Sequence, residues 1–161
     1  MTTALIGALI ICIASALLEG LAAGSGVRQR FAELRLPRLS PPLPVWVGIG
    51  LLYYVICFAI SYRLLGAGIG LSLRGGAFAL LLVLMGINIF WNVVFFRRKD
   101  LYASYFSFWP YPLVALALLL VLWTSDTLAA WIFLPYFLYL GYAIWWGRRL
   151  WQLNGSMPRA T

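Results

Sequence analysis

The sequence predicts an all-α integral membrane protein, a bundle of five transmembrane helices. Its 161 residues are 64% hydrophobic and only 10% charged, whereas a soluble domain carries about 25% charged residues to keep its exterior solvated. Apolar runs long enough to cross about 30 Å of hydrocarbon recur along the chain. We expect one domain over residues 1–161, with helices at about 4–25, 45–65, 75–96, 101–124 and 128–147.

The first apolar run, residues 4–25, contains a single acid, Glu19. Two interpretations of it remain open: the carboxylate reaches the membrane interface, or it faces a ligand or accepts a proton inside the bundle. The run has no basic segment before it and no small-residue cleavage site after it, so we expect it to stay as a membrane helix.

Residues 27–44 form the one substantial polar connection. Arginines outnumber the single acid there, and apolar side chains lie between them, so we expect the segment to lie along the membrane interface. Four prolines disfavour a regular helix and stiffen the path: Pro37, Pro41, Pro42 and Pro44. The segment is either a lid over one end of the bundle or a simple connector.

The remaining spans carry a few polar or helix-breaking residues. In the fourth span, the segment from Trp109 to Pro112 contains two prolines and predicts a kink, whose freed carbonyls need other donors. Asp126 follows this span in a short polar turn, where its side chain can cap the fifth helix.

The third span presents a polar and aromatic face. Asn88, Trp91, Asn92 and Phe95 recur at intervals of three and four residues, which places them on one side of a helix. Three cations, residues 97–99, then mark where this helix leaves the hydrocarbon. An amide inside a membrane must find a partner, either on a neighbouring helix or in a ligand cavity. Two amides a turn apart beside an indole favour the wall of a cavity.

The distribution of cations predicts the orientation. An odd number of spans places the two termini on opposite sides of the membrane. One side carries Arg63 and Arg74. The other side carries many more cations, so we expect it to be cytoplasmic and the N-terminus to be outside: Arg28, Arg30, Arg35, Arg38, Arg97, Arg98, Lys99, Arg148, Arg149 and Arg159. Because these cations follow the ends of apolar runs, the net charge of +8 indicates topology and not nucleic-acid binding.

The residue types present exclude several chemistries. The chain has no histidine, which excludes Ser-His-Asp and Cys-His catalysis and removes the commonest metal ligand. Cys12 and Cys57 lie inside apolar runs, where a thiol behaves as a small hydrophobe. We expect no metal site and no cofactor. Aromatic residues make up 17% of the chain, and a cavity lined by rings with a few hydrogen-bonding groups suits a large planar apolar ligand.

Several motifs together resemble the TspO/MBR family, the tryptophan-rich sensory proteins and the translocator protein, also known as the peripheral-type benzodiazepine receptor. Its first-loop signature L-x-K-P-x-x-x-P-P, followed by L-Y, is similar to the pattern of Leu34, Pro37, Pro41, Pro42 and Tyr54. Its third-helix motif N-x-x-W-x-x-x-F-F is similar to Asn88, Trp91, Phe95 and Phe96. Its fifth-helix and closing motifs are similar to Leu134, Pro135, Tyr136, Leu153 and Asn154.

The resemblance implies a bundle, often dimeric, whose cavity binds porphyrins, haem, sterols or synthetic ligands beneath the first loop. Carried over by position, the ligand-binding residues are Trp46, Tyr54, Asn88, Trp91, Phe95, Tyr136, Tyr139, Leu140 and Tyr142. The first loop, with Pro41 and Pro42, would act as a lid, and Arg28, Arg30 or Arg38 would attract ligand carboxylates. The expected partners are therefore membrane lipid, a planar hydrophobic ligand and a second copy of the chain.

Two departures from the family pattern concern porphyrin chemistry. Gly50 and Tyr139 stand where the family has the tryptophans that are linked to light-dependent porphyrin breakdown. We therefore expect a receptor or carrier rather than an enzyme. Two alternatives stay open: an enzyme of light- and oxygen-dependent porphyrin degradation, and a ligand-free regulatory or structural membrane partner.

Overall fold

The computed structural model describes residues 1–67 and 73–155, so Arg159 and part of the connection between the second and third spans lie outside it. Five helical segments are long and apolar enough to cross a membrane, and the described residues contain no strand. The expected fold class is confirmed. The helices are α1 (Thr2–Ala23), α2 (Val27–Glu33), α3 (Leu43–Gly66), α4 (Leu73–Asn92) with η1 (Val93–Arg97), α5 (Leu101–Ser107), α6 (Pro110–Ser125) and α7 (Thr127–Asn154).

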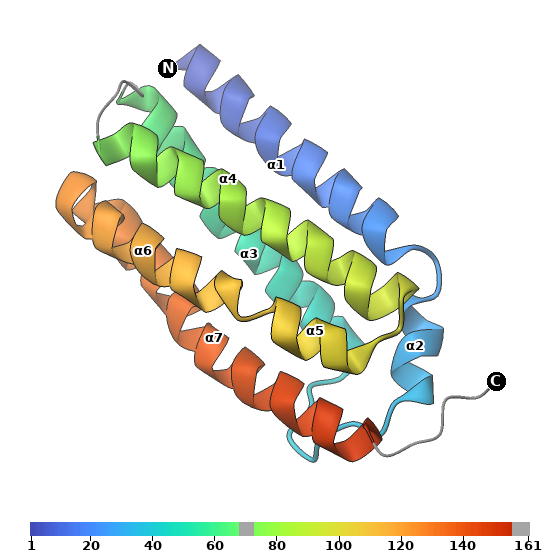
Figure 1. The fold of residues 1–161 in the computed structure, drawn as a ribbon. Coiled ribbons are helices and arrows are strands. Elements are labelled where there is room, and N and C mark those ends of the chain that lie inside the picture. The colour runs from blue at the N-terminus through green and yellow to red at the C-terminus, as the bar shows by residue number, and fades with distance from the viewer. Residues whose placement is uncertain (68–72, 156–161) are drawn as a thin grey trace.

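The long helices run side by side, with α2 across one end (Figure 1). Helix α1 packs against α3 and α4, α4 packs against α6, and α7 packs against α6 and α3. The shared core contains fully buried aliphatic side chains such as Ile60, Leu81 and Leu118. Only 17–33% of each span's most apolar window is buried, so most apolar side chains face outward. Such a surface is suited to lipid, and the chain is an integral membrane protein.

The predicted kink in the fourth span is a complete break between α5 and α6, at Phe108 and Trp109. Pro110 begins α6, where a proline needs no amide donor. The carbonyl of Ser104, in the last turn of α5, accepts a hydrogen bond of 3.2 Å from the indole Nε1 of Trp91. A donor on α4 thus satisfies a carbonyl beside the break, as the sequence requires.

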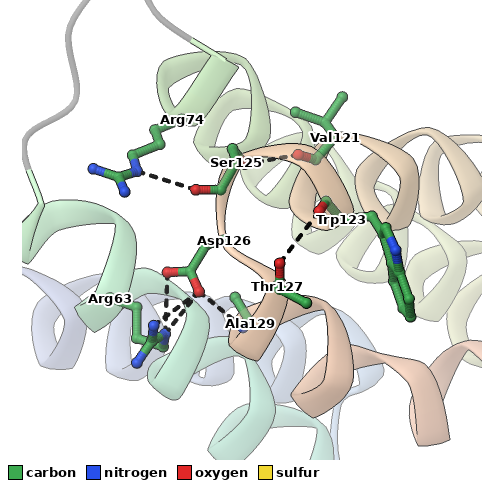
Figure 2. Close-up of polar contacts among 8 residues, drawn as sticks. All are labelled: Arg63, Arg74, Val121, Trp123, Ser125, Asp126, Thr127 and Ala129. Carbon is green, nitrogen blue, oxygen red and sulfur yellow. Dashed lines mark hydrogen bonds and ion pairs between the residues drawn. The ribbon is translucent and has the colours of Figure 1, made fainter.

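The turn between α6 and α7 is fixed by Asp126, which caps α7 by accepting a hydrogen bond from the Ala129 amide (Figure 2). Its carboxylate also forms an ion pair with Arg63 of α3, at 2.8 Å. Arg74 of α4 donates to the carbonyl of Ser125. Burial alone would raise the pKa of Asp126, but the hydrogen bonds from Arg63 and Ala129 outweigh it and lower that pKa. The turn therefore ties α3, α4, α6 and α7 together at one end of the bundle.

The first loop differs from the expected extended path, because residues 27–33 form helix α2. The spacing of the prolines permits this helix, because they begin only at Pro37 and leave seven residues free to form two helical turns. Arg30 joins this helix to the bundle by donating to the carbonyl of Lys99, at 2.9 Å. Lys99 in turn forms an ion pair of 3.1 Å with Glu33.

The last helix also differs, since it continues to Asn154 instead of ending near residue 147. The side chain of Asn154 explains the extension. Its Oδ1 accepts from the Arg35 amide at 2.9 Å, and its Nδ2 donates to the Arg35 carbonyl at 3.0 Å. This pair of hydrogen bonds holds the loop after α2 against the end of α7.

Candidate ligand-binding cavity

A cavity of about 520 Å³ lies inside the bundle, lined by residues of α1, α2, α3, α4, η1, α5 and α7. Its volume falls within the range of about 300–1,000 Å³ that is typical of small-molecule sites. Helix α2 contributes Val27 and Phe31 to its lining, so the cavity reaches the end of the bundle that α2 covers.

The cavity brings together most of the residues that the sequence assigns to ligand binding. The residues that line it are Trp46, Tyr54, Asn88, Trp91, Phe95, Tyr136, Tyr139 and Leu140. Tyr142 does not line it: its hydroxyl donates to the Leu39 carbonyl at 2.8 Å, and its ring lies 6.3 Å from that of Trp46. Tyr142 therefore holds the first loop against α7.

The loop residues expected to form the lid or to attract ligand carboxylates do not line the cavity. Arg28, Arg38 and Pro42 are exposed, and Pro41 is half-buried on the loop. Arg30 is buried, and its guanidinium carbon lies 5.7 Å from the centre of the Phe95 ring. Burial lowers the pKa of this guanidinium, and the charge of Glu33 opposes that effect. Arg30 therefore contacts the Lys99 carbonyl and the Phe95 ring and holds α2 against the bundle.

A carboxylate with three neutral donors forms the polar part of the wall. Glu19 Oε2 accepts hydrogen bonds from Tyr54 Oη at 2.5 Å and from Asn88 Nδ2 at 3.0 Å. Its Oε1 accepts from Asn92 Nδ2 at 3.1 Å. All four residues line the cavity. Of the two interpretations of Glu19, the structure supports the inward-facing one, and the two amides face both the cavity and a neighbouring helix.

Aromatic rings form the adjoining wall. The rings of Trp91 and Phe95 are stacked, with centroids 4.7 Å apart and an interplanar angle of 14°. Phe96 lies edge-on to Phe95 at 4.8 Å. Both phenylalanines line the cavity although they are consecutive. They belong to the π-helical turn η1, closed by a hydrogen bond from the Arg98 amide to the Val93 carbonyl, and such turns widen the helix and are frequent at functional sites.

Two donors near the cavity have no hydrogen-bond partner among the described residues. They are the buried Nε1 of Trp46 and the buried hydroxyl of Tyr53, and both residues line the cavity. A buried donor that stays unpaired costs free energy, so such groups usually meet water or a ligand. Both atoms are themselves buried, so neither donor is open to the cavity in this structure.

Sequence reasoning left several lining residues out of the proposed site. The sequence leaves Glu19 open to two interpretations, at the membrane interface or inside the bundle. It places Asn92 on the correct face of α4 but does not assign it to the site. Phe96 lies on that wall because of the π-helical turn, which no pattern in the sequence predicts. Phe31 is left out because the sequence predicts an extended loop there, whereas helix α2 places Phe31 against the cavity. For Glu19 a signal existed, because two amides inside a membrane need an acceptor.

A bundle of five membrane-spanning helices around a cavity of rings and hydrogen-bonding groups fits a membrane ligand-binding protein. A sequence model of the TspO/MBR family matches residues 8–152, which is nearly the whole chain. The protein therefore belongs to the TspO/MBR family. Comparison with curated protein sequences finds no match.

Proposed function

We propose that this protein is a membrane receptor or carrier that binds a planar hydrophobic ligand, of the porphyrin or sterol-like class, inside the helix bundle. The observation that carries the proposal is the cavity wall on which the stacked Trp91 and Phe95 rings adjoin the amide of Asn88. Phe95 is 1% exposed and Trp91 is only partly buried, so Trp91 is the ring of this pair that a flat ligand would contact, and stacked or edge-on ring contacts contribute beyond the area they bury.

The role of Trp91 follows from its hydrogen bond. Its indole N–H is used by the Ser104 carbonyl, so the ligand would meet the face or edge of the ring and not its donor. The bond also fixes the orientation of the ring, which lowers the entropic cost of ordering it on binding. Asn88, which lines the cavity, would then supply a directional contact to the ligand.

The charges at the two ends of the bundle support the proposed orientation. Helix α2, the segment after η1 and the end of α7 lie at one end (Figure 1), and most cations of the described residues belong to these segments. Positively charged loops are retained in the cytoplasm. We therefore place the α2 end of the cavity on the cytoplasmic side and the N-terminus outside.

Titration of the purified protein with protoporphyrin IX dimethyl ester, which has no free carboxylate, and with a fluorescent sterol, followed by tryptophan fluorescence, tests the proposal. We expect saturable quenching with at least one of the two ligands. Trp91→Ala should weaken the affinity about tenfold, or about 1.4 kcal/mol, which is near the upper end of the roughly 0.5–1.5 kcal/mol that an aromatic ring contact contributes.

The matched control is Trp131→Ala, because Trp131 is 56% exposed on the outer surface of α7 and is not among the lining residues. This control removes one reporter and leaves the cavity intact. Absence of saturable quenching by either ligand, or equal weakening by the two substitutions, would refute binding in this cavity.

A further inference from the structure

We infer that the cavity selects planar ligands that carry a positive charge, and that Glu19 is the group that receives this charge. The inference rests on the proposed function and adds the chemical class of the ligand to it. It follows from the charge, the hydrogen-bonding capacity and the ring content of the cavity wall.

The formal charge of the cavity is negative. Among the lining residues that the structure describes, Glu19 is the only one with a charged side chain. Two cations that are adjacent in sequence to lining residues bind other partners: Arg30 donates to the Lys99 carbonyl, and Arg97 donates to the Ala22 carbonyl at 2.9 Å and to the Leu21 carbonyl. A ligand carboxylate in this cavity would meet a like charge, which is unfavourable where little water screens it.

The carboxylate of Glu19 has capacity for one more donor. An ionised carboxylate has about four acceptor positions, and the three hydrogen bonds from Tyr54, Asn88 and Asn92 leave one of them, on Oε1. All three donors are neutral, so they orient the carboxylate without neutralising it. A ligand ammonium group would supply the missing donor and the missing countercharge together.

The rings around Glu19 favour the same charge. Tyr54 touches the carboxylate directly, and Trp91 lies on the same helix as Asn88 and Asn92 and also lines the cavity. The face of an aromatic ring is electronegative and attracts cations, and quaternary ammonium ligands are bound in cages of such rings. A cavity that holds one carboxylate and is lined by aromatic rings therefore suits a cation better than a neutral or anionic group.

Three anthracenes that share one ring system provide the test: 9-(aminomethyl)anthracene is cationic, 9-methylanthracene is neutral and anthracene-9-carboxylate is anionic. Their affinities are measured for the full-length protein in nonionic detergent by fluorescence titration. We expect the ammonium compound to bind about tenfold more tightly than the neutral one, because a charge-assisted hydrogen bond contributes at least that much. The carboxylate should bind more weakly than the neutral compound.

The matched variants are Glu19→Gln and Glu33→Gln. Both remove one negative charge at the α2 end of the bundle, but Glu33 is exposed on α2 and does not line the cavity. Glu19→Gln should abolish the preference for the ammonium compound, measured on that variant as the ratio of its affinity to that of 9-methylanthracene. Glu33→Gln should keep the preference.

The outcomes separate the two proposals. If none of the three compounds binds the wild-type protein, the proposed function and the inference fail together. If 9-methylanthracene binds but the ammonium compound has no advantage, or if Glu33→Gln removes that advantage as fully as Glu19→Gln, the cavity binds ligands and the assignment of Glu19 is wrong. Should Glu19→Gln not fold, the ranking of the three compounds on the wild-type protein still decides the inference.

Discussion

Replacing Arg30 with alanine should release α2 from the bundle. Arg30 is 8% exposed; it donates to the Lys99 carbonyl at 2.9 Å, and its guanidinium lies over the Phe95 ring. A hydrogen bond from a charged donor contributes about 1.5–3 kcal/mol, and a partly desolvated cation–π contact contributes about 0.5–2 kcal/mol. The buried Nε of Arg30, which has no partner among the described residues, subtracts from this sum.

A net loss of about 2–3 kcal/mol follows, which corresponds to a roughly 30- to 150-fold increase in the opening of α2. Hydrogen exchange of the peptide that covers residues 27–33, followed by mass spectrometry in detergent, measures this opening. The control is Arg28→Ala, since Arg28 is exposed on the same short helix and its removal should change exchange less than threefold. Arg30→Lys keeps the charge but loses the planar fork, so an intermediate increase is expected.

The same pair of variants distinguishes docking from ligand attraction. If Arg30 acted on ligand carboxylates, Arg30→Ala would weaken protoporphyrin binding while the exchange of α2 stayed unchanged. Equal exchange in Arg30→Ala and Arg28→Ala would refute the magnitude worked out above, and with it the role of Arg30 as the contact that holds α2.

Three further predictions concern other contacts. The pKa of Asp126 is lowered in the folded state. The ionised carboxylate therefore stabilises the fold above its unfolded pKa of about 3.9, and this effect is lost as the pH falls through the folded pKa. The thermal unfolding temperature should decline on acidification below about pH 4, and less steeply in Asp126→Asn. Asn154→Ala leaves the Arg35 amide and carbonyl without their partner and should destabilise the loop by about 1–3 kcal/mol, seen as faster proteolysis after Arg35 with little change in ligand affinity. Gly50 lines the cavity, and a Cβ built there meets no atom within 4 Å. Gly50→Trp should therefore fill the cavity and weaken ligand binding at least about tenfold at an unchanged unfolding temperature. Unaltered affinity would contradict the assigned cavity.

The membrane helices could be predicted from the sequence because a single physical requirement determines them. A segment in hydrocarbon must be long, apolar and internally hydrogen-bonded, and each of these properties can be read locally. Helix α2 and the π-helical turn could not be predicted in this way. The first depends on the docking of Arg30 against Lys99, 69 residues away, and the second on how Phe95 and Phe96 pack around the cavity.

The polar cluster could be predicted only in part. The spacing of the two amides predicts the donors, but the acceptor follows only when the acids of the chain are compared. Asn88 and Asn92 lie one turn apart on α4 and needed an acceptor inside the membrane. The chain has only four acids, and three of them lie in connections between spans: Glu33, Asp100 and Asp126. Glu19 alone lies within a predicted span, so elimination pairs it with the two amides, and the structure joins them across α1 and α4. Three neutral donors orient this carboxylate but do not neutralise it. A ligand can therefore supply the donor and the positive charge that Glu19 lacks.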